Sequence, residues 1–182
     1  MRESRQGHAG LVVWLTGLSG AGKTTIATEL ERRLFERGLH TCLLDGDALR
    51  TGLCSDLGFG AEDRRENIRR AGAVAGLFAD TGCIVICAFI SPFRDDRDRI
   101  RASLPPDRFV EVFVNADLEV CERRDVKGLY AKARSGLLKD FTGISAPYEP
   151  PLRAEMEIRT DRLSVADSVT ALFDYVTGHC RR

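Results

Sequence analysis

The chain has 182 residues, with 27 lysines and arginines, 27 aspartates and glutamates, and a formal net charge of zero. This length predicts a single domain over residues 1–182. The balanced charge argues against a duplex nucleic-acid binder, which usually carries a basic excess, but it leaves small anionic ligands open. The longest apolar run, residues 83–90, is far shorter than the about 20 residues that a membrane-spanning helix needs.

The cysteines indicate a reducing environment. They stand at positions 42, 54, 83, 87, 121 and 180 without a CxxC pair, and the histidines at 8, 40 and 179 do not cluster with them, so the spacing of a zinc site is absent. The start of the chain, MRESRQGHAG, is polar and lacks the apolar core of a signal peptide. We therefore expect free thiols, no membrane association and a cytoplasmic protein.

Apolar stretches alternate with helical patterns along the chain. Strands are expected at 11–16, 41–44, 84–90, 109–114 and, more weakly, 156–160, and helices at 23–37, 64–80, 118–124 and 164–176. Ser164 is the expected N-cap of the last helix, with Asp167 at the capping-box position. Strands separated by helices predict an α/β fold with a doubly wound parallel sheet flanked by helices.

Residues 125–151 interrupt this alternation. They are rich in glycine and proline, and a loop of this length inside a compact domain is usually functional, often as a lid. Residues 122–140 carry six basic and three acidic side chains. The sequence therefore predicts a basic lid over about 122–150 that closes on anionic substrates.

A phosphate-binding loop follows the first predicted strand. The segment Gly17-Leu18-Ser19-Gly20-Ala21-Gly22-Lys23-Thr24 fits the pattern GxxxxGK[ST] and opens a predicted helix. The backbone N–H groups of such a loop surround phosphate oxygens, the lysine reaches the β and γ phosphates, and the threonine hydroxyl can bind Mg²⁺. An ordinary glycine-rich turn would not combine the strand, the Lys-Thr pair and the helix in this order. We therefore expect residues 17–25, Thr25 included, to bind ATP.

Acidic and basic clusters follow the loop. The strand at 84–90 ends without an aspartate, so the available acids are Asp45 and Asp47 at the end of the second strand, which should face the same crevice. Arg64 and Asn67 lie three apart on a predicted helix and, with Arg50, could hold a doubly charged anion. The alternative for these arginines is a solvated helix face with Glu66–Arg70 pairing.

Six blocks of the sequence together resemble adenylylsulfate kinase (APS kinase). They are GLSGAGKTT, DGDALRTGL, DLGFGAEDRRENIRR, FISPFRDDR, RDVKGLYAKAR and FTGISAPYEPP, in family order over roughly residues 11–160. The resemblance implies a P-loop kinase fold and transfer of the γ-phosphoryl of ATP to the 3′-hydroxyl of adenosine 5′-phosphosulfate (APS). The products are 3′-phosphoadenosine 5′-phosphosulfate (PAPS) and ADP, in sulfate assimilation.

The resemblance also implies roles for individual residues. Asp47 is expected to accept the proton of the 3′-hydroxyl, with Lys23 as the other catalytic residue, and Thr24 and Asp45 to hold Mg²⁺. The substrate-binding set that the resemblance implies is Asp47, Arg50, Phe59, Arg64, Asn67, Ile90, Ser91, Lys127 and Phe141. Arg124 is expected to pack on the ATP base, and Phe59 and Phe141 on the APS adenine. These assignments have structural alternatives. The two phenylalanines could be core residues, Lys127 a surface lysine, Ser91 a turn residue and Asp45 a helix cap.

Partners and departures follow from the same resemblance. It implies a homodimer, and the short polar start, similar to kinase domains fused to sulfate adenylyltransferase, permits association with that enzyme. Val126 stands where the family often has proline, which would loosen the hinge of the lid. Two other hypotheses remain: a P-loop kinase for another small hydroxyl acceptor, and a non-catalytic nucleotide-binding module that serves a sulfate adenylyltransferase.

Overall fold

The computed structural model describes residues 7–180. Its elements are β1 (Leu11–Thr16), α2 (Lys23–Glu36), β2 (Thr41–Asp45), α3 (Gly46–Arg50), α4 (Ala61–Asp80), β3 (Ile84–Ala88), α5 (Arg94–Ser103), β4 (Phe109–Asn115), α6 (Leu118–Arg124), α7 (Leu129–Arg134), β5 (Met156–Arg159) and α8 (Val165–Cys180). The expectation that the chain starts without a signal peptide falls largely on residues 1–6, which lie outside the described residues.

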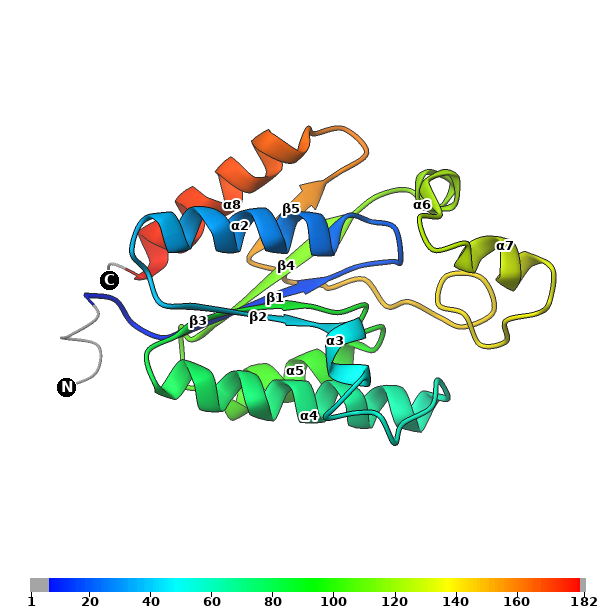
Figure 1. Cartoon of the computed structure of the whole chain (residues 1–182), viewed down its shortest axis with the longest axis horizontal. Coiled ribbons are helices and arrows are strands. Elements are labelled where there is room, and N and C mark those ends of the chain that lie inside the picture. The colour runs from blue at the N-terminus through cyan, green and yellow to red at the C-terminus, as the bar shows by residue number, and fades with distance from the viewer. Residues whose placement is uncertain (1–6, 181–182) are drawn as a thin grey trace.

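The five strands form one parallel sheet in the order β2-β3-β1-β4-β5. Helices α2 and α8 cover one face of the sheet, and α4 and α5 cover the other (Figure 1). This confirms the predicted doubly wound α/β fold. The strand order changes direction at β1, which lies between β3 and β4, and the crevice beyond such a strand is where ligands bind in this class of sheet.

Strand β1 divides the interior into two apolar layers because its side chains alternate between the two faces. Leu11, Val13 and Leu15 pack with buried residues of α2 and α8. Val12 and Trp14 pack with buried residues of α4 and α5. Burial on both faces explains why this strand reads as a continuous apolar run.

The predicted strands and helices are confirmed, with differences at some ends. Strand β3 ends at Ala88 rather than at residue 90, and α4 begins at Ala61 rather than at 64. The expected N-cap is confirmed, because the Asp167 N–H donates to Ser164 Oγ at 3.1 Å. In place of the reciprocal backbone bond of a full capping box, Ser164 Oγ donates to the Asp167 carboxylate at 2.6 Å.

Three helices were not predicted: α3, α5 and α7. In α5, Ile100 is the only large apolar side chain, so the sequence shows no apolar stripe. Helix α7 lies inside the predicted loop, where the Asp125 carboxylate accepts hydrogen bonds from the N–H groups of Tyr130 and Ala131, both at 3.0 Å. Because this carboxylate lies five residues before Tyr130, outside the helix, the sequence of α7 shows no periodic pattern that would predict it.

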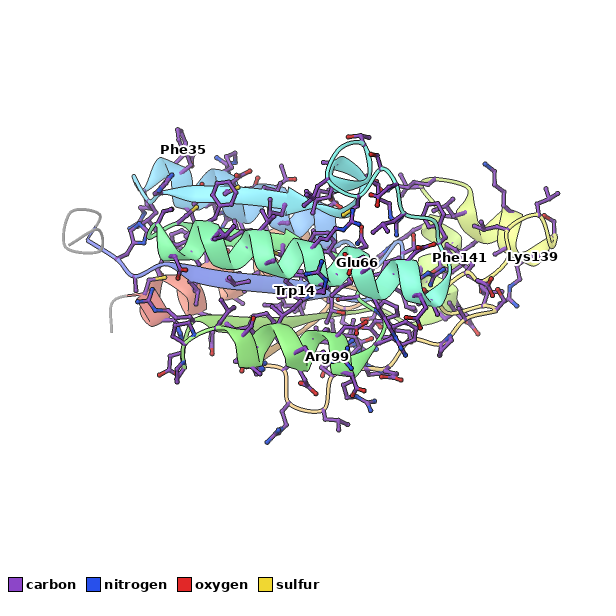
Figure 2. All side chains as sticks on the ribbon, turned by 90° about the horizontal axis from the view of Figure 1, so that it is seen from below. Trp14, Phe35, Glu66, Arg99, Lys139 and Phe141 are labelled. Atoms are coloured by element: carbon purple, nitrogen blue, oxygen red, sulfur yellow. The ribbon has the colours of Figure 1, made fainter. Side chains whose placement is uncertain are left out.

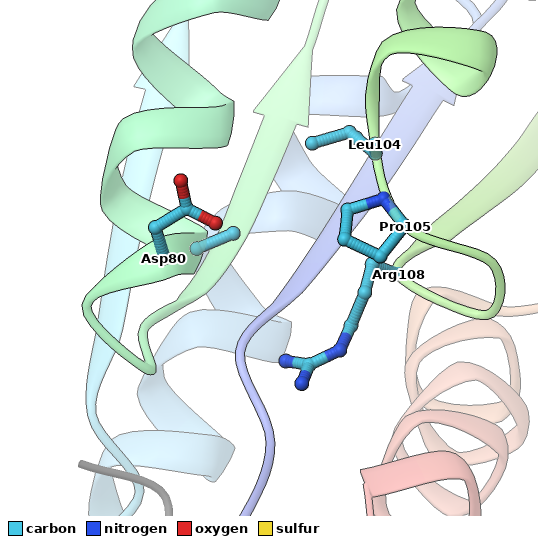
Figure 3. Close-up of a pocket in the computed structure, with 5 residues that line it drawn as sticks. Asp80, Leu104, Pro105 and Arg108 are labelled. Carbon is cyan, nitrogen blue, oxygen red and sulfur yellow. The ribbon is translucent and has the colours of Figure 1, made fainter. Parts of the chain in front are cut away.

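The two ends of the sheet differ in character. The carboxyl ends of the strands, α3, α6 and α7 lie at one end of the molecule, away from both termini (Figure 1). At the amino end, a small cavity of about 100 Å³ is lined by Ala79, Asp80, Leu104, Pro105 and Arg108 (Figure 3).

Among residues 7–180, no helix combines the length and apolar character that crossing a bilayer requires.

Candidate active site

The phosphate loop connects β1 to α2 in a conformation that requires glycine. Gly22 has φ +99°, and a Cβ atom on Gly17 would lie 2.2 Å from the carbonyl oxygen of Val114. The sequence-predicted ATP-binding residues 17–25 therefore lie together, at the carboxyl end of β1 and the first turn of α2. The N-terminus of α2 adds partial positive charge there, which suits phosphate groups.

Lys23 points back into this loop. Its Nζ donates to the carbonyl oxygens of Gly17 at 2.9 Å and Leu18 at 2.7 Å, and the residue is only 8% exposed. Burial lowers the pKa of Lys23 from its ordinary value of 10.5 to about 8. The loop thus holds an ammonium group that neighbouring anionic phosphate would stabilise.

The two sequence-predicted acids lie beside the loop. Thr24 Oγ1 donates to Asp45 Oδ2 at 2.9 Å, and Asp45 Oδ1 accepts from the N–H of Asp47 at 2.9 Å. Asp45 is therefore the N-cap of α3, as the structural alternative supposed. The same carboxylate also contacts Thr24, so it can cap the helix and lie at the expected magnesium site. The exposed carboxylate of Asp47 forms an ion pair with Lys127 of the lid segment, residues 122–150.

These oxygens fit a magnesium site better than a closed metal cage. In the described part of the chain, no three His, Cys, Asp or Glu side chains gather where they could hold a metal ion. Mg²⁺ in nucleotide sites takes one or two protein oxygens and completes its shell with phosphate and water. Thr24 and Asp45 supply two oxygens in contact with each other beside the phosphate loop.

Arg50, Phe59 and Arg64 form a second group at the same edge. The Arg50 guanidinium lies 4.3 Å from the centre of the Phe59 ring, and its Nη1 donates to the Gly58 carbonyl at 2.9 Å. Arg64 Nε donates to the Phe59 carbonyl at 2.8 Å. Phe59 is 62% exposed, so its ring is available to a ligand rather than part of the core.

Arg64 also links this group to the lid segment. Its guanidinium donates to the carbonyl of Asp140 and to Thr142 Oγ1, on either side of Phe141. Burial lowers the pKa of Arg64, and the positive charge of Arg50 lowers it further. Phe141 is 7% exposed and belongs to the buried core, which agrees with the alternative of a core aromatic. Figure 2 shows Phe141 at the same end of the molecule as Lys139. The two phenylalanines are thus tied to one arginine.

The polar side chains of α4 divide into two groups. Asn67 is buried, and its Oδ1 has no hydrogen-bond partner. Glu66 instead bonds Arg69 at 2.6 Å and Arg70 at 2.9 Å, and Arg70 continues to Asp56 at 2.6 Å. The solvated-face alternative therefore applies to Glu66, Arg69 and Arg70, whereas Asn67 keeps a free acceptor at the site end of the helix.

Ile90 and Ser91 form a turn after β3. The Ile90 carbonyl accepts from Thr16 Oγ1 at 2.8 Å, and Ser91 is 1% exposed. Ser91 Oγ accepts from Trp14 Nε1 at 3.0 Å and donates to Thr16 Oγ1 at 2.9 Å. The serine side chain therefore faces the interior, and contact with substrate at this position would involve the backbone.

Sequence reasoning missed the buried arginine that supports this turn. Arg97 donates to the Ser91 carbonyl at 2.6 Å and to the Glu149 carbonyl at 2.8 Å, and it pairs with Glu111 at 2.6 Å. It joins the turn to the end of the lid segment. The residue lies within the quoted block FISPFRDDR, but the pattern carries no sign that this arginine, among several, is buried.

Arg124 lies across the phosphate loop from the acids. Its guanidinium donates to the Gly20 carbonyl at 3.1 Å and to the Thr160 carbonyl at 2.7 Å. Thr160, which sequence reasoning also missed, donates to the Ala21 carbonyl at 2.7 Å. Beside this loop, an open groove of about 630 Å³ runs between α2 and the start of α8, and Thr24 and Thr25 contribute to its lining.

Comparison with known proteins identifies the family to which this site belongs. Residues 9–159 match the family model described as adenylylsulphate kinase. The adenylyl-sulfate kinase of Shewanella baltica is 57% identical over 177 residues, which cover 97% of this chain and 86% of that protein.

Solved structures agree. The APS kinase of Mycobacterium tuberculosis, in complex with AMPPNP and APS, superposes with a TM-score of 0.87 at 44% identity, covering 93% of this chain and 98% of that one. A hexameric APS kinase from Thiobacillus denitrificans gives a TM-score of 0.73 at 33% identity, covering 97% of this chain and 31% of that one. The chain described here therefore belongs to the adenylylsulphate kinase family.

Proposed function

We propose that this chain transfers the γ-phosphoryl group of ATP to the 3′-hydroxyl of APS, giving PAPS and ADP. The observation that carries the proposal is the convergence of Lys23, the Thr24–Asp45 pair and Asp47 at one edge of the sheet. Arg50 and Arg64 lie on the neighbouring segment at that edge, together with an exposed aromatic ring. This combination suits a nucleotide donor and a flat, dianionic acceptor.

On the donor side, the phosphate loop and Lys23 bind and orient the ATP phosphates. Lys23 gives up its two loop carbonyls and moves onto the β and γ phosphates, where its charge offsets the negative charge that develops during transfer. Thr24 and Asp45 would hold Mg²⁺, which would neutralise charge on the phosphate oxygens. Arg124 borders the loop at Gly20 and is placed to pack on the nucleotide base.

On the acceptor side, Asp47 accepts the proton of the 3′-hydroxyl. The carboxylate is exposed at the start of α3 and is held there by the hydrogen bond from its own N–H to Asp45. Phe59 and Phe141 bind the APS adenine, and Arg50, Arg64 and Asn67 bind the phosphosulfate. Ile90 and Ser91 form the wall behind the acceptor.

The lid segment completes the site. Lys127 pairs with Asp47, which brings the basic lid over the acids. We propose that Lys127 moves to an anionic oxygen of the substrates when they bind, which frees Asp47 to act as the base. A lid closed over both nucleotides excludes water and limits hydrolysis of ATP.

Replacement of the base tests the proposal. Asp47→Asn keeps the shape of the side chain but removes the proton acceptor, so PAPS formation should slow by about 100-fold or more. The Kd for ADP should stay unchanged, because the phosphate loop is intact. Asp98→Asn, an exposed change on α5, is the matched control and should keep the wild-type rate. Product analysis by chromatography gives the measurement, and a wild-type kcat in Asp47→Asn would exclude this aspartate as the base.

The partners and location remain predictions. We propose a homodimer in the cytoplasm, and association with a sulfate adenylyltransferase, the class of enzyme that makes APS, is an extension of the same proposal. Sedimentation of the purified chain with and without such an enzyme would measure both associations.

A further inference from the structure

Tyr130 is a buried polar side chain to which the proposed reaction assigns no role. It lies in α7 of the lid segment and is 2% exposed. A core position of this kind could be filled by phenylalanine. The hydroxyl, however, donates to the carbonyl oxygen of Ser19, in the middle of the phosphate loop, at 2.9 Å.

The ring of the same tyrosine contacts the aromatic residue proposed to bind the acceptor. The Tyr130 and Phe141 ring centres are 4.9 Å apart, with an interplanar angle of 85°, an edge-to-face arrangement. The backbone around Phe141 is fixed as well: its carbonyl accepts from the N–H groups of Ser145 and Ala146, both at 3.0 Å. The Phe141 backbone is therefore well anchored, and a shift of the Tyr130 ring would disturb its contact with the Phe141 ring.

The backbone of Tyr130 is anchored by Asp125, which precedes α7. The N–H of Tyr130 donates to Asp125, and this backbone hydrogen bond lowers the pKa of the Asp125 carboxyl. Burial raises the pKa of Tyr130 well above its ordinary range, so the hydroxyl stays protonated and acts as a donor to Ser19. The side chain is a short, rigid connection between the loop that surrounds the ATP phosphates and the ring beside the acceptor.

We propose that Tyr130 is a positioning residue that couples nucleotide binding at the phosphate loop to acceptor binding at Phe141. The inference rests on the proposed function, because it takes APS as the ligand of Phe141. A nucleotide that orders the loop fixes the Ser19 carbonyl, and through Tyr130 it fixes the Phe141 ring before APS arrives. Coupling of this kind is reciprocal, so each ligand strengthens binding of the other by the same factor.

The test is a binding cycle by calorimetry, with AMPPNP as the non-transferable donor. In the wild type, saturating AMPPNP should lower the Kd for APS by about fivefold or more, within the usual range for coupled sites. Tyr130→Phe removes the hydrogen bond to Ser19 but keeps the ring contact with Phe141. Each ligand alone should therefore bind as before, while the coupling factor, the ratio of the APS Kd values without and with AMPPNP, falls toward one. Tyr175→Phe removes a hydroxyl from α8, outside the lid segment, where the tyrosine ring stacks on His179, and should leave the coupling factor unchanged.

A measurement on the wild type covers the case in which Tyr130→Phe does not fold. AMPPNP alone should slow amide hydrogen exchange in residues 129–141, which lie in the lid segment, while exchange in the second half of α8 stays the same. An unchanged coupling factor in Tyr130→Phe, or no AMPPNP-dependent protection of residues 129–141, overturns the inference. If the wild type binds no APS with or without AMPPNP, the proposed function itself fails, and the coupling fails with it.

Discussion

At the scale of single residues, the buried ammonium of Lys23 is the least ordinary charge in the site. It is surrounded by the carbonyls of its own loop, and its pKa is about 8. The group is thus half neutral near pH 8 in the free enzyme. A bound phosphate favours the charged form, so nucleotide binding raises this pKa and takes up a proton.

This gives a prediction for pH dependence. Because the charged form binds phosphate, the affinity for ADP with Mg²⁺ should fall as the pH rises through about 8, and binding at that pH should take up about half a proton. Calorimetry in buffers of different ionisation enthalpy measures the uptake. Lys23→Arg keeps its charge throughout and should bind without uptake. A wild-type Kd that stays constant between pH 7 and pH 9 would contradict this account of Lys23.

Residue-level reasoning singled out segments that the structure brings together at one edge of the sheet, and their chemical roles stay predictions. The phosphate loop and the Asp45–Asp47 pair are recognisable because glycine, lysine and paired acids follow strands. The sequence could not reveal that Arg97 is buried against Glu111, nor that Ser91 faces the interior, because neighbouring arginines look alike and the direction of the serine depends on its bonds to β1. Contacts between distant segments decided both.

At the scale of elements, local signals predicted the strands, the long helices and the short α6, whereas tertiary contacts decided α3, α5 and α7. Strand β1 and helix α8 carry apolar patterns that are complete within the segment. Helix α5 is stabilised by Ile100, which packs on Gly72 of α4, and by the buried Arg97. Such partners belong to other parts of the chain, so no window of sequence around α5 contains them.

The N-cap of α8 gives an element-scale prediction. Ser164→Ala removes the acceptor for the Asp167 N–H and should lower the free energy of unfolding by about 1 kcal/mol. Urea denaturation monitored by circular dichroism measures the change. Ser135→Ala, an exposed serine at the C-terminal end of α7, is the control and should have a smaller effect. Equal losses in the two variants would mean that Ser164 does not cap the helix.

At the scale of the whole molecule, one buried ion pair ties the sheet to the site. Arg97 of α5 and Glu111 of β4 are both nearly inaccessible, and the arginine also holds the Ser91 turn and the end of the lid segment at Glu149. Removing one partner leaves the other charge buried without its counterion, which is far more costly than losing a surface pair.

Glu111→Ala should therefore lower the free energy of unfolding by about 3–5 kcal/mol. The paired change Arg97→Met with Glu111→Met removes both charges and should recover much of this loss. Glu29→Ala, which breaks an exposed pair with Arg32 on α2, should change stability little. Chemical denaturation compares the three proteins. A loss in Glu111→Ala no greater than in Glu29→Ala would show that the buried pair does not stabilise the fold.

The chain's zero net charge conceals a division of charge over the molecule. The basic lid segment and the arginines of α3 and α4 face the acids at the end of β2, and the whole arrangement surrounds one edge of the sheet. Such a site suits two phosphorylated adenosines. The central claim is that the 3′-hydroxyl of APS accepts the phosphoryl group.

The most direct test is the rate of ADP release from ATP and Mg²⁺ with APS, compared with AMP, gluconate and shikimate as acceptors. APS should give ADP and an equal amount of PAPS, at a rate far above that with any other acceptor. ADP release with another acceptor and not with APS would contradict the account and identify a kinase of different specificity. Nucleotide binding without ADP release in any of these mixtures would instead indicate a non-catalytic module.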